Sequence, residues 1–252
     1  MLAKSHYENF PVASILVPKY MRNGLTAVYA VARLGDDIAD ELETVNVINP
    51  VTGMSVGKVQ GLHVLDHVVD GTFPHQNNPV FMAIQDTIAR HNLPSAPFHR
   101  LFEAFRRDVS NDTTIMTSWD DVYDYCSYSA NPVGELMLRL SGDWETSVQP
   151  YSDAICTALQ ITNFLQDISV DTARSRHYIP GMPSQPLSDL QTSRKVLCEA
   201  RSIANDLYDY GKAIVHVPKS LRLSLELRAI ITGGKYMLRK CTEKILYQRS
   251  TL

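Results

Sequence analysis

Two segments of the chain carry acidic and amide side chains at helical spacing. Tyr29, Arg33, Asp36 and Asp40 recur at i, i+4, i+7 and i+11. With about 3.6 residues per turn, they share an arc of roughly 60° on one helical face. A second arc of roughly 80° holds Gln160, Asn163, Asp167 and Asp171. Oxygen ligands of this kind suit Mg²⁺, which usually binds one or two carboxylates together with substrate phosphates.

Apolar residues flank both polar stripes. Val31 and Ile38 lie beside the first, and Phe164 and Ile168 beside the second. A solvated helix face is normally wide, and its apolar residues lie on the opposite side. We therefore expect the four aspartates to be buried, where only cations could balance them. The residues alone leave two explanations open, which are divalent metal ions and internal salt bridges such as one between Arg33 and Asp37.

Helical periodicity covers most of the chain and no segment alternates with the period of a strand. Ser118 is predicted to cap a helix, with Asp121 three positions later. Pro97 and Pro132 stand where helices should begin. The pattern predicts an all-α fold, with helices over 22–42, 80–91, 98–108, 119–126, 132–140, 153–173, 192–216 and 221–245.

Composition narrows the class of protein. The 252 residues carry a net charge of −3, which argues against a general nucleic-acid binder. The polar segment Met1–Phe10 lacks the apolar core of a signal peptide, and no apolar stretch is long enough for a membrane span. The four cysteines match no zinc motif, so we expect reduced core thiols and a cytoplasmic location.

The two aspartate segments also carry a resemblance. Residues 36–40 (DDIAD) and 163–171 (NFLQDISVD), roughly 130 positions apart, resemble the paired aspartate motifs of the squalene/phytoene synthase family. More narrowly, residues 6–14 (HYENFPVAS), 129–134 (SANPVG) and 176–180 (RHYIP) look similar to bacterial hydroxysqualene synthases of hopanoid biosynthesis. The resemblance runs from His6 to about Tyr178 and resumes in the C-terminal helices.

This resemblance implies a single domain over residues 1–252, a helical bundle of the isoprenoid synthase type with a central cavity. It implies two or three Mg²⁺ ions held by Asp36, Asp40, Asp167 and Asp171. Catalytic roles would fall to Tyr125, Asn163, Asp36 and Asp167. Substrate contacts would come from Tyr29, Arg33, Gln160, Arg176 and Tyr178.

The resemblance further implies the reaction of presqualene diphosphate with water to give hydroxysqualene and diphosphate, a carbon–oxygen lyase step. One alternative is a prenyltransferase joining two prenyl diphosphates head to head, giving presqualene diphosphate, dehydrosqualene or phytoene. Many relatives have a Ser-x-Ser motif where this chain has Tyr7-Glu8-Asn9, which favours the hydroxysqualene branch. The other alternative is a non-catalytic helical scaffold, although such relatives tend to lose the acidic pairs.

Further expectations concern cofactors and partners. No GxGxxG motif follows a strand, so no NADPH is expected. The partners would be a prenyl diphosphate and enzymes of the same pathway. A triterpene product implies loose peripheral contact with the inner face of the cytoplasmic membrane. Asp108 is interpreted as an ordinary surface ion pair, and the segment 181–189 is shorter than in most relatives.

Overall fold

A computed structural model describes residues 14–40, 47–48, 55–73, 78–110, 115–183 and 189–247. These residues form an all-α protein, as predicted, apart from one small antiparallel hairpin of β1 (Val47–Ile48) and β2 (Ser55–Val56). The helices are α1 (Lys19–Asp40), α2 (Lys58–Val69), α3 (Pro79–His91), α4 (Ala96–Ser110), α5 (Trp119–Ser129), α6 (Asn131–Ser141), α7 (Gln149–Ala173), α8 (Leu190–Gly211) and α9 (Leu221–Tyr247).

Local sequence signals explain several helix starts. The Ser118 side chain accepts a hydrogen bond from the Asp121 backbone N–H, and Asp121 bonds back to Ser118, which completes a capping box at α5. Pro97 and Pro132 lie in the first turns of α4 and α6, as predicted. Asp153 does not open its helix, because α7 begins four residues earlier, at Gln149. The predicted 192–216 helix ends at Gly211 and continues as a 3₁₀ turn, Lys212–His216.

Helix α2 was absent from the sequence prediction. Gly57 precedes the helix and Gly61 lies in its first turn. These glycines favoured the prediction of a loop in this region. Leu62, Leu65 and Val68 nevertheless recur at helical spacing, and all three are fully buried. This apolar stripe is the signal that could have identified the helix. It also explains why tertiary packing outweighs the low helix propensity of the glycines.

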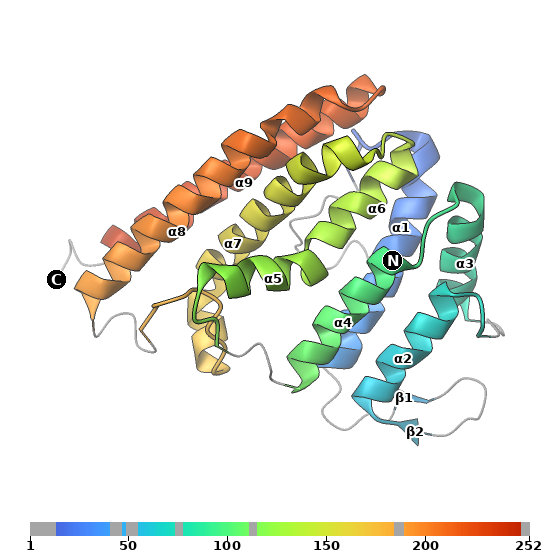
Figure 1. Cartoon of the computed structure of the whole chain (residues 1–252), viewed down its shortest axis with the longest axis horizontal. Helices are drawn as coiled ribbons and strands as arrows, with labels where there is room; N and C mark the ends of the chain where they lie inside the picture. Colours follow the sequence, from blue (N-terminus) through green and yellow to red (C-terminus); the bar gives the residue numbers. More distant parts are fainter. Residues whose placement is uncertain are drawn as a thin grey trace.

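The buried side chains form two hydrophobic clusters. One is built mainly from α1, α2, α3, α4 and α6, with Met21, Phe98 and Leu136 fully buried, and it includes Leu223 of α9. The other is built mainly from α5, α7, α8 and α9, with Ile161 and Tyr208 fully buried, and it includes Leu138 of α6. Figure 1 shows α8 and α9 beside α7 at one end and α2 and α3 at the other. The two ends of the bundle therefore have separate cores, with α5, α6 and α7 between them.

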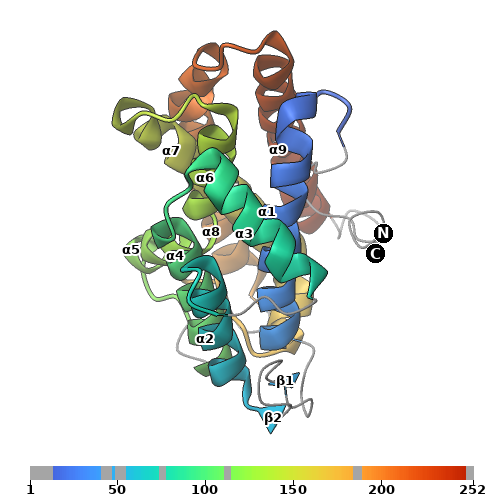
Figure 2. The same ribbon diagram turned by 90° about the vertical axis from the view of Figure 1, so that its right-hand side faces the viewer.

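Helix α9 packs closely against α8 and α7 through Gly234. A Cβ at this position would lie 2.2 Å from the Tyr208 hydroxyl, so only glycine fits without movement. Gly233 has nothing within 4 Å of such a Cβ, so it is not a packing contact. In Figure 2, α1 stands in front of α9, and the β1–β2 hairpin lies at the foot of α2.

Two expectations from composition can be compared with the structure. The four cysteines are free, and Cys126 and Cys241 are buried. The core assignment is wrong for Cys198, which is exposed on α8. Among the described residues, no helix combines the length and hydropathy that a membrane span requires.

Candidate functional site

A cavity of about 560 Å³ lies between α1 and α4 on one side and α5 and α7 on the other. The turn that follows α7 completes its wall. All ten predicted site residues whose side chains are described line this cavity: Tyr29, Arg33, Asp36, Tyr125, Gln160, Asn163, Asp167, Asp171, Arg176 and Tyr178. Asp40 is the last residue of α1, and its side chain lies outside the described part of the chain. The fold therefore brings both polar stripes to one space.

The α1 wall holds an ion-paired cluster. Arg33 lies 3.0 Å from Asp36 and 2.8 Å from Asp37. The predicted salt bridge to Asp37 is therefore present, together with a second one to Asp36. Because the Arg33 side chain is only 19% exposed, these pairs compensate charge at the edge of a partly buried site.

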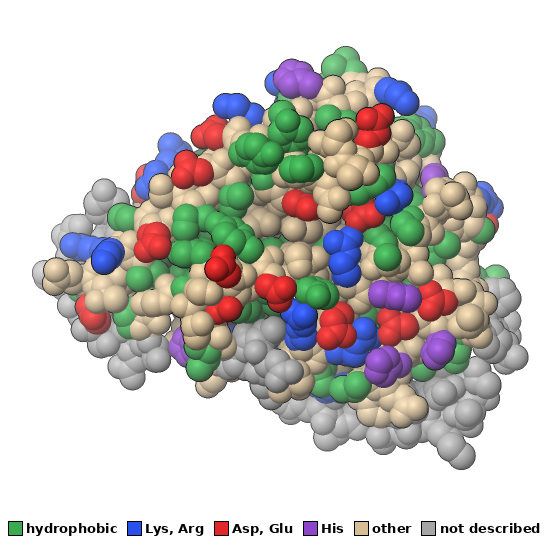
Figure 3. Space-filling model, in the orientation of Figure 1, with side chains coloured by type: hydrophobic (Ala, Val, Ile, Leu, Met, Phe, Trp, Pro, Cys, Tyr) green, Lys and Arg blue, Asp and Glu red, His purple; other side chains and the backbone are tan. Residues whose placement is uncertain are grey.

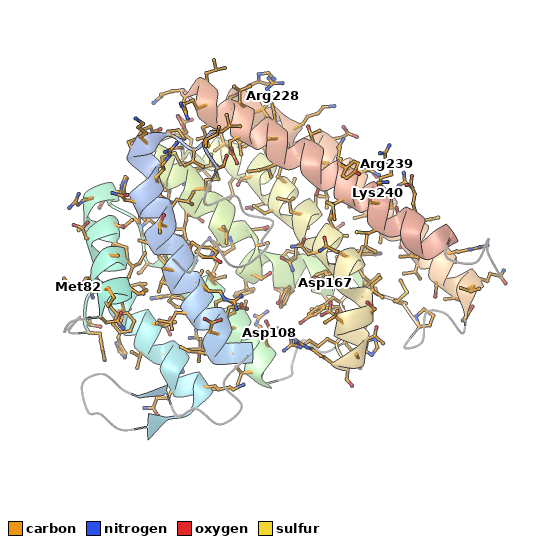
Figure 4. All side chains as sticks on the ribbon, turned by 180° about the vertical axis from the view of Figure 1, so that it is seen from behind. Met82, Asp108, Asp167, Arg228, Arg239 and Lys240 are labelled. Carbon is orange, nitrogen blue, oxygen red and sulfur yellow. The ribbon has the colours of Figure 1, made fainter. Side chains whose placement is uncertain are left out.

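The aspartates are less buried than the sequence suggested. The Asp36 side chain is 43% exposed, and Asp167 is exposed while Asp171 is half-buried. Desolvation by the surrounding walls still raises the pKa of Asp167 above its ordinary value. Helical periodicity predicted the correct face, but these carboxylates line the cavity where water reaches them. Figure 4 shows Asp108 and Asp167 near the space framed by α1 and α7.

The chain reverses immediately after α7 and brings Arg176 back toward Asp171. Ser175 adopts a left-handed backbone conformation with φ of 58°. The Arg176 backbone N–H then donates to the Asp171 carbonyl at 2.8 Å. The next residue is held in place because the Met116 N–H donates to the His177 carbonyl at 2.8 Å. This turn positions a cationic side chain beside the second aspartate motif.

Three aromatic rings form another part of the cavity wall. The rings of Phe164 and Tyr178 are stacked, with centroids 4.4 Å apart and planes 7° from parallel. Tyr125 approaches Tyr178 with a centroid separation of 5.6 Å. Phe164 was interpreted from the sequence only as an apolar neighbour of the α7 stripe. Its partners lie on α5 and in the turn after α7, so sequence spacing alone could not reveal this cluster.

Asp108 is a site residue that the sequence analysis misassigned. It lines the cavity from α4 and accepts a hydrogen bond from the Tyr125 hydroxyl at 3.0 Å. It therefore lies on the cavity wall, a position that the sequence analysis did not predict. Burial, followed by the charge of Asp108, raises the pKa of Tyr125 well above its ordinary value. The phenol consequently stays protonated and serves as a donor at any ordinary working pH.

The donor set suits a hard cation, with one condition. Asp36, Asp108, Asp167 and Asp171 all offer oxygen to the same cavity, as Mg²⁺ requires. Among the side chains that the structure describes, however, no three acidic, histidine or cysteine groups lie close enough to bind a metal by themselves. Mg²⁺ commonly completes its shell with water and substrate phosphate. The residues therefore fit Mg²⁺ as a co-ligand of a phosphorylated compound.

Comparison with known proteins gives a consistent result. A family model described as squalene/phytoene synthase matches residues 3–244. The hydroxysqualene synthase of Zymomonas mobilis is 38% identical over 69% of this chain, and the match spans 54% of that relative. The chain thus spans about half the length of this relative. The hydroxysqualene synthase of Sinorhizobium fredii is 31% identical over 89% of this chain and 76% of its own length.

Solved structures agree with these sequence matches. The crystal structure of squalene synthase HpnC from Alicyclobacillus acidocaldarius superposes with a TM-score of 0.81 and 33% identity. That superposition covers 97% of this chain and 91% of the other. A dehydrosqualene synthase in complex with a ligand has a TM-score of 0.71 at 19% identity, covering 94% and 90% of the two chains. The second likeness shows the shared helical fold.

Proposed function

The chain belongs to the squalene/phytoene synthase family, and on that premise we propose that it converts presqualene diphosphate and water to hydroxysqualene and diphosphate. Members of this family are enzymes that act on prenyl diphosphates. The observation that carries the proposal is the single cavity that joins both aspartate motifs to an aromatic wall. Its polar end suits a diphosphate, and its aromatic wall suits the carbocation that remains when diphosphate leaves.

The polar end of the cavity would bind the leaving group. Arg33 on α1 and Arg176 in the turn after α7 both line it, and their planar guanidinium groups can donate paired hydrogen bonds to phosphate oxygens. Asp36, Asp167 and Asp171, with Asp40 as the fourth predicted ligand, would hold Mg²⁺. When bound, Mg²⁺ supplies neutralisation of the charge that develops on the departing diphosphate. Arg33 would exchange its present aspartate partners for diphosphate oxygens.

The aromatic wall would stabilise the cation. Ionisation breaks the carbon–oxygen bond to diphosphate, and both electrons leave with the oxygen. The faces of aromatic rings attract cations, and Tyr29, Tyr125, Phe164 and Tyr178 all line the cavity. Apolar residues such as Val28 and Leu159 occupy the same wall, and they would exclude water from most of the prenyl chain.

Tyr125 and Asn163 would position the water that ends the reaction. Because the Tyr125 hydroxyl donates to Asp108, its oxygen lone pairs remain available to accept a hydrogen bond from that water. The Asn163 amide lines the same cavity from α7. The water oxygen forms a bond to the cationic carbon, and the water loses one proton. Asp108 is the nearest base in the Tyr125 hydrogen-bond chain, so that proton would pass toward its carboxylate.

The direct test uses the purified full chain. It is incubated with Mg²⁺ and presqualene diphosphate in water enriched in heavy oxygen, and the product is identified by mass spectrometry. We expect hydroxysqualene that carries the oxygen of the solvent, together with free diphosphate. An unlabelled hydrocarbon, or recovery of intact substrate, would refute water capture as the final step.

A head-to-head condensation is the second candidate. The phytoene synthase of Mycobacterium tuberculosis is 30% identical over 71% of this chain and 55% of its own length, so a related prenyltransferase reaction has support. A parallel incubation with farnesyl diphosphate alone distinguishes the two. Formation of presqualene diphosphate or dehydrosqualene from farnesyl diphosphate would favour condensation. A third reading, a non-catalytic scaffold, predicts neither product, although the cavity retains acidic side chains from both motifs.

Substitution of one aspartate from each motif tests whether these carboxylates are needed for diphosphate release. Asp36→Asn and Asp167→Asn should each lower diphosphate release roughly 100-fold, because each removes a negative charge that the site needs to hold Mg²⁺. Diphosphate release is measured by a coupled phosphate assay at saturating Mg²⁺. Asp86→Asn on α3 is the matched control, because Asp86 is an exposed partner of Arg90 and does not line the cavity. Full activity in either cavity variant would exclude the proposed role of that aspartate.

A further inference from the structure

The outer face of α9 is basic and lacks exposed acidic residues from Leu221 to Lys240. Ten exposed positions recur at helical spacing and span an arc of roughly 140°, and four of the ten are basic. They are Leu221, Arg222, Leu225, Arg228, Ala229, Thr232, Gly233, Tyr236, Arg239 and Lys240. The one acid within this span, Glu226, points inward and is 2% exposed. We call these ten residues the α9 stripe.

Within the described part of the chain, most charges of the α9 stripe have no acidic partner on the stripe itself. Arg239 lies 3.9 Å from Glu243, a half-buried residue just beyond the stripe. Arg222 donates to the Ile15 carbonyl. Among the described side chains, no acidic group lies within ion-pair distance of Arg228 or Lys240. The chain as a whole has a net charge of −3, so the stripe is a local concentration of the opposite sign.

Another face of the molecule shows what an ordinary solvated surface looks like here. Over α2 and α4, acidic, basic and histidine side chains are interspersed (Figure 3). Arg106 pairs with Asp66 at 2.8 Å, and His99 pairs with Asp70 at 3.0 Å. That surface neutralises its own charge. The α9 stripe does not, so it is suited to a partner that supplies negative charge.

Exposed apolar side chains run along the same stripe. Leu221 is 74% exposed, Tyr236 is 51% exposed and Leu225 is 44% exposed. The Arg239 guanidinium lies 5.6 Å from the centre of the Tyr236 ring, and the Lys240 ammonium lies 5.7 Å from it. A surface helix that combines basic residues with Leu and Tyr is typical of binding in the plane of a membrane interface. Figure 4 shows Arg228, Arg239 and Lys240 on the outer side of α9.

We infer that the α9 stripe docks this protein on an anionic lipid surface, with α9 lying along the plane of the membrane. The cations would contact lipid phosphates, and Leu221, Leu225 and Tyr236 would enter the boundary between headgroups and acyl chains. A nucleic acid would satisfy the cations but would leave two exposed leucines without apolar surroundings. This inference does not depend on the proposed reaction, because α9 contributes no residue to the cavity lining.

Vesicle flotation of the full chain tests the docking surface. The protein is mixed with vesicles of phosphatidylcholine alone or with added phosphatidylglycerol, and the bound fraction is measured. The double variant Arg228→Gln/Lys240→Gln removes two cations of the stripe and should bind anionic vesicles roughly 30-fold more weakly. The matched control, Arg90→Gln/Lys195→Gln, removes two exposed cations from α3 and α8 and should keep most of its binding. The unmodified protein should lose binding as salt rises.

A second variant tests the apolar part of the surface. Leu221→Ser/Tyr236→Ser keeps every charge and should also weaken binding, because it removes two side chains that would enter the boundary between headgroups and acyl chains. A purely electrostatic contact would be unaffected by this variant. Circular dichroism should show unchanged helicity for all variants. The inference is overturned if the unmodified protein ignores anionic vesicles, or if the stripe and control variants bind equally. It is also overturned if light scattering shows a dimer that the stripe variants disrupt without lipid, because the stripe would then bind a second copy.

Discussion

At the scale of single residues, the hydrogen bond from Tyr125 to Asp108 is the contact that most changes the picture of the site. It joins α5 to α4 across the cavity wall at 3.0 Å. A hydrogen bond to a charged group contributes about 1.5–3 kcal/mol. The bond fixes the direction in which the Tyr125 proton points. The lone pairs of the Tyr125 oxygen therefore remain free to accept a hydrogen bond from water in the cavity.

Tyr125→Phe should lower turnover roughly 100-fold if this hydroxyl orients the capturing water. Asp108→Asn should lower it as well, because the amide cannot accept a proton. The double variant should be little worse than either single one, since both act through one hydrogen-bond chain. Turnover and urea stability are measured for all three. Tyr128→Phe is the control, because Tyr128 is covered by Arg107 at 3.9 Å and lies outside the cavity. Additive losses would contradict a shared role.

The carboxylates make a second prediction at this scale. Because no three of the described ligand-type side chains bind a metal unaided, Mg²⁺ alone should bind weakly to the substrate-free protein. Adding inorganic diphosphate should create a much tighter ternary complex, since its oxygens complete the shell. Isothermal titration of Mg²⁺ with and without diphosphate measures this directly. Equal Mg²⁺ affinity in the two titrations would argue against a shared metal–diphosphate site.

At the scale of elements, the close approach of helix α6 to helix α7 supports one wall of the cavity. A Cβ on Gly134 would lie 2.5 Å from the Ser152 hydroxyl and 2.6 Å from the Cys156 sulfur. Cys156 itself lines the cavity. The glycine thus lets α6 lie close enough to α7 to hold that wall in place, and the motif at 129–134 has a packing reason for ending in Gly.

Gly134→Ala should destabilise the protein by about 1–3 kcal/mol, because the added methyl group forces α6 and α7 apart. Urea denaturation followed by circular dichroism gives the change in the free energy of unfolding. Gly233→Ala on α9 is the contrasting variant, since nothing lies within 4 Å of its added Cβ. That variant should be neutral or more stable by up to about 1 kcal/mol. Similar destabilisation in both would show that close packing is not the cause.

The elements also show where sequence reasoning works and where it stops. Ser118 and Asp121 lie three positions apart, so the capping box at α5 could be read directly from the chain. The helix α2 could not be recognised as readily, because Gly61 within it favours a turn when viewed locally. The position of Asp108 in the cavity was missed for a related reason. Its partner Tyr125 is 17 positions away on another helix, and no spacing rule connects them.

At the scale of the whole molecule, the cavity separates two hydrophobic clusters. Val28 on α1 belongs to one cluster and Phe164 on α7 to the other, and both line the cavity. The sequence predicted which face of each aspartate helix is polar, because each stripe marks one helical face. It did not predict how deeply the carboxylates would lie, because depth depends on how far apart the clusters stand. That separation is set by many contacts remote from the stripes.

A ligand that spans this cavity should therefore join the two clusters. A non-hydrolysable prenyl diphosphate analogue with Mg²⁺ should raise the melting temperature, since binding to the folded state alone at about 100 times Kd adds about 2.7 kcal/mol. Hydrogen exchange should slow in both α1 and α7, because aspartates from each helix would hold the Mg²⁺ that accompanies the diphosphate. The corresponding prenyl alcohol, which lacks the diphosphate, should protect far less. Protection confined to one of the two helices would mean that the polar stripes do not act together, and the cavity would then need another ligand.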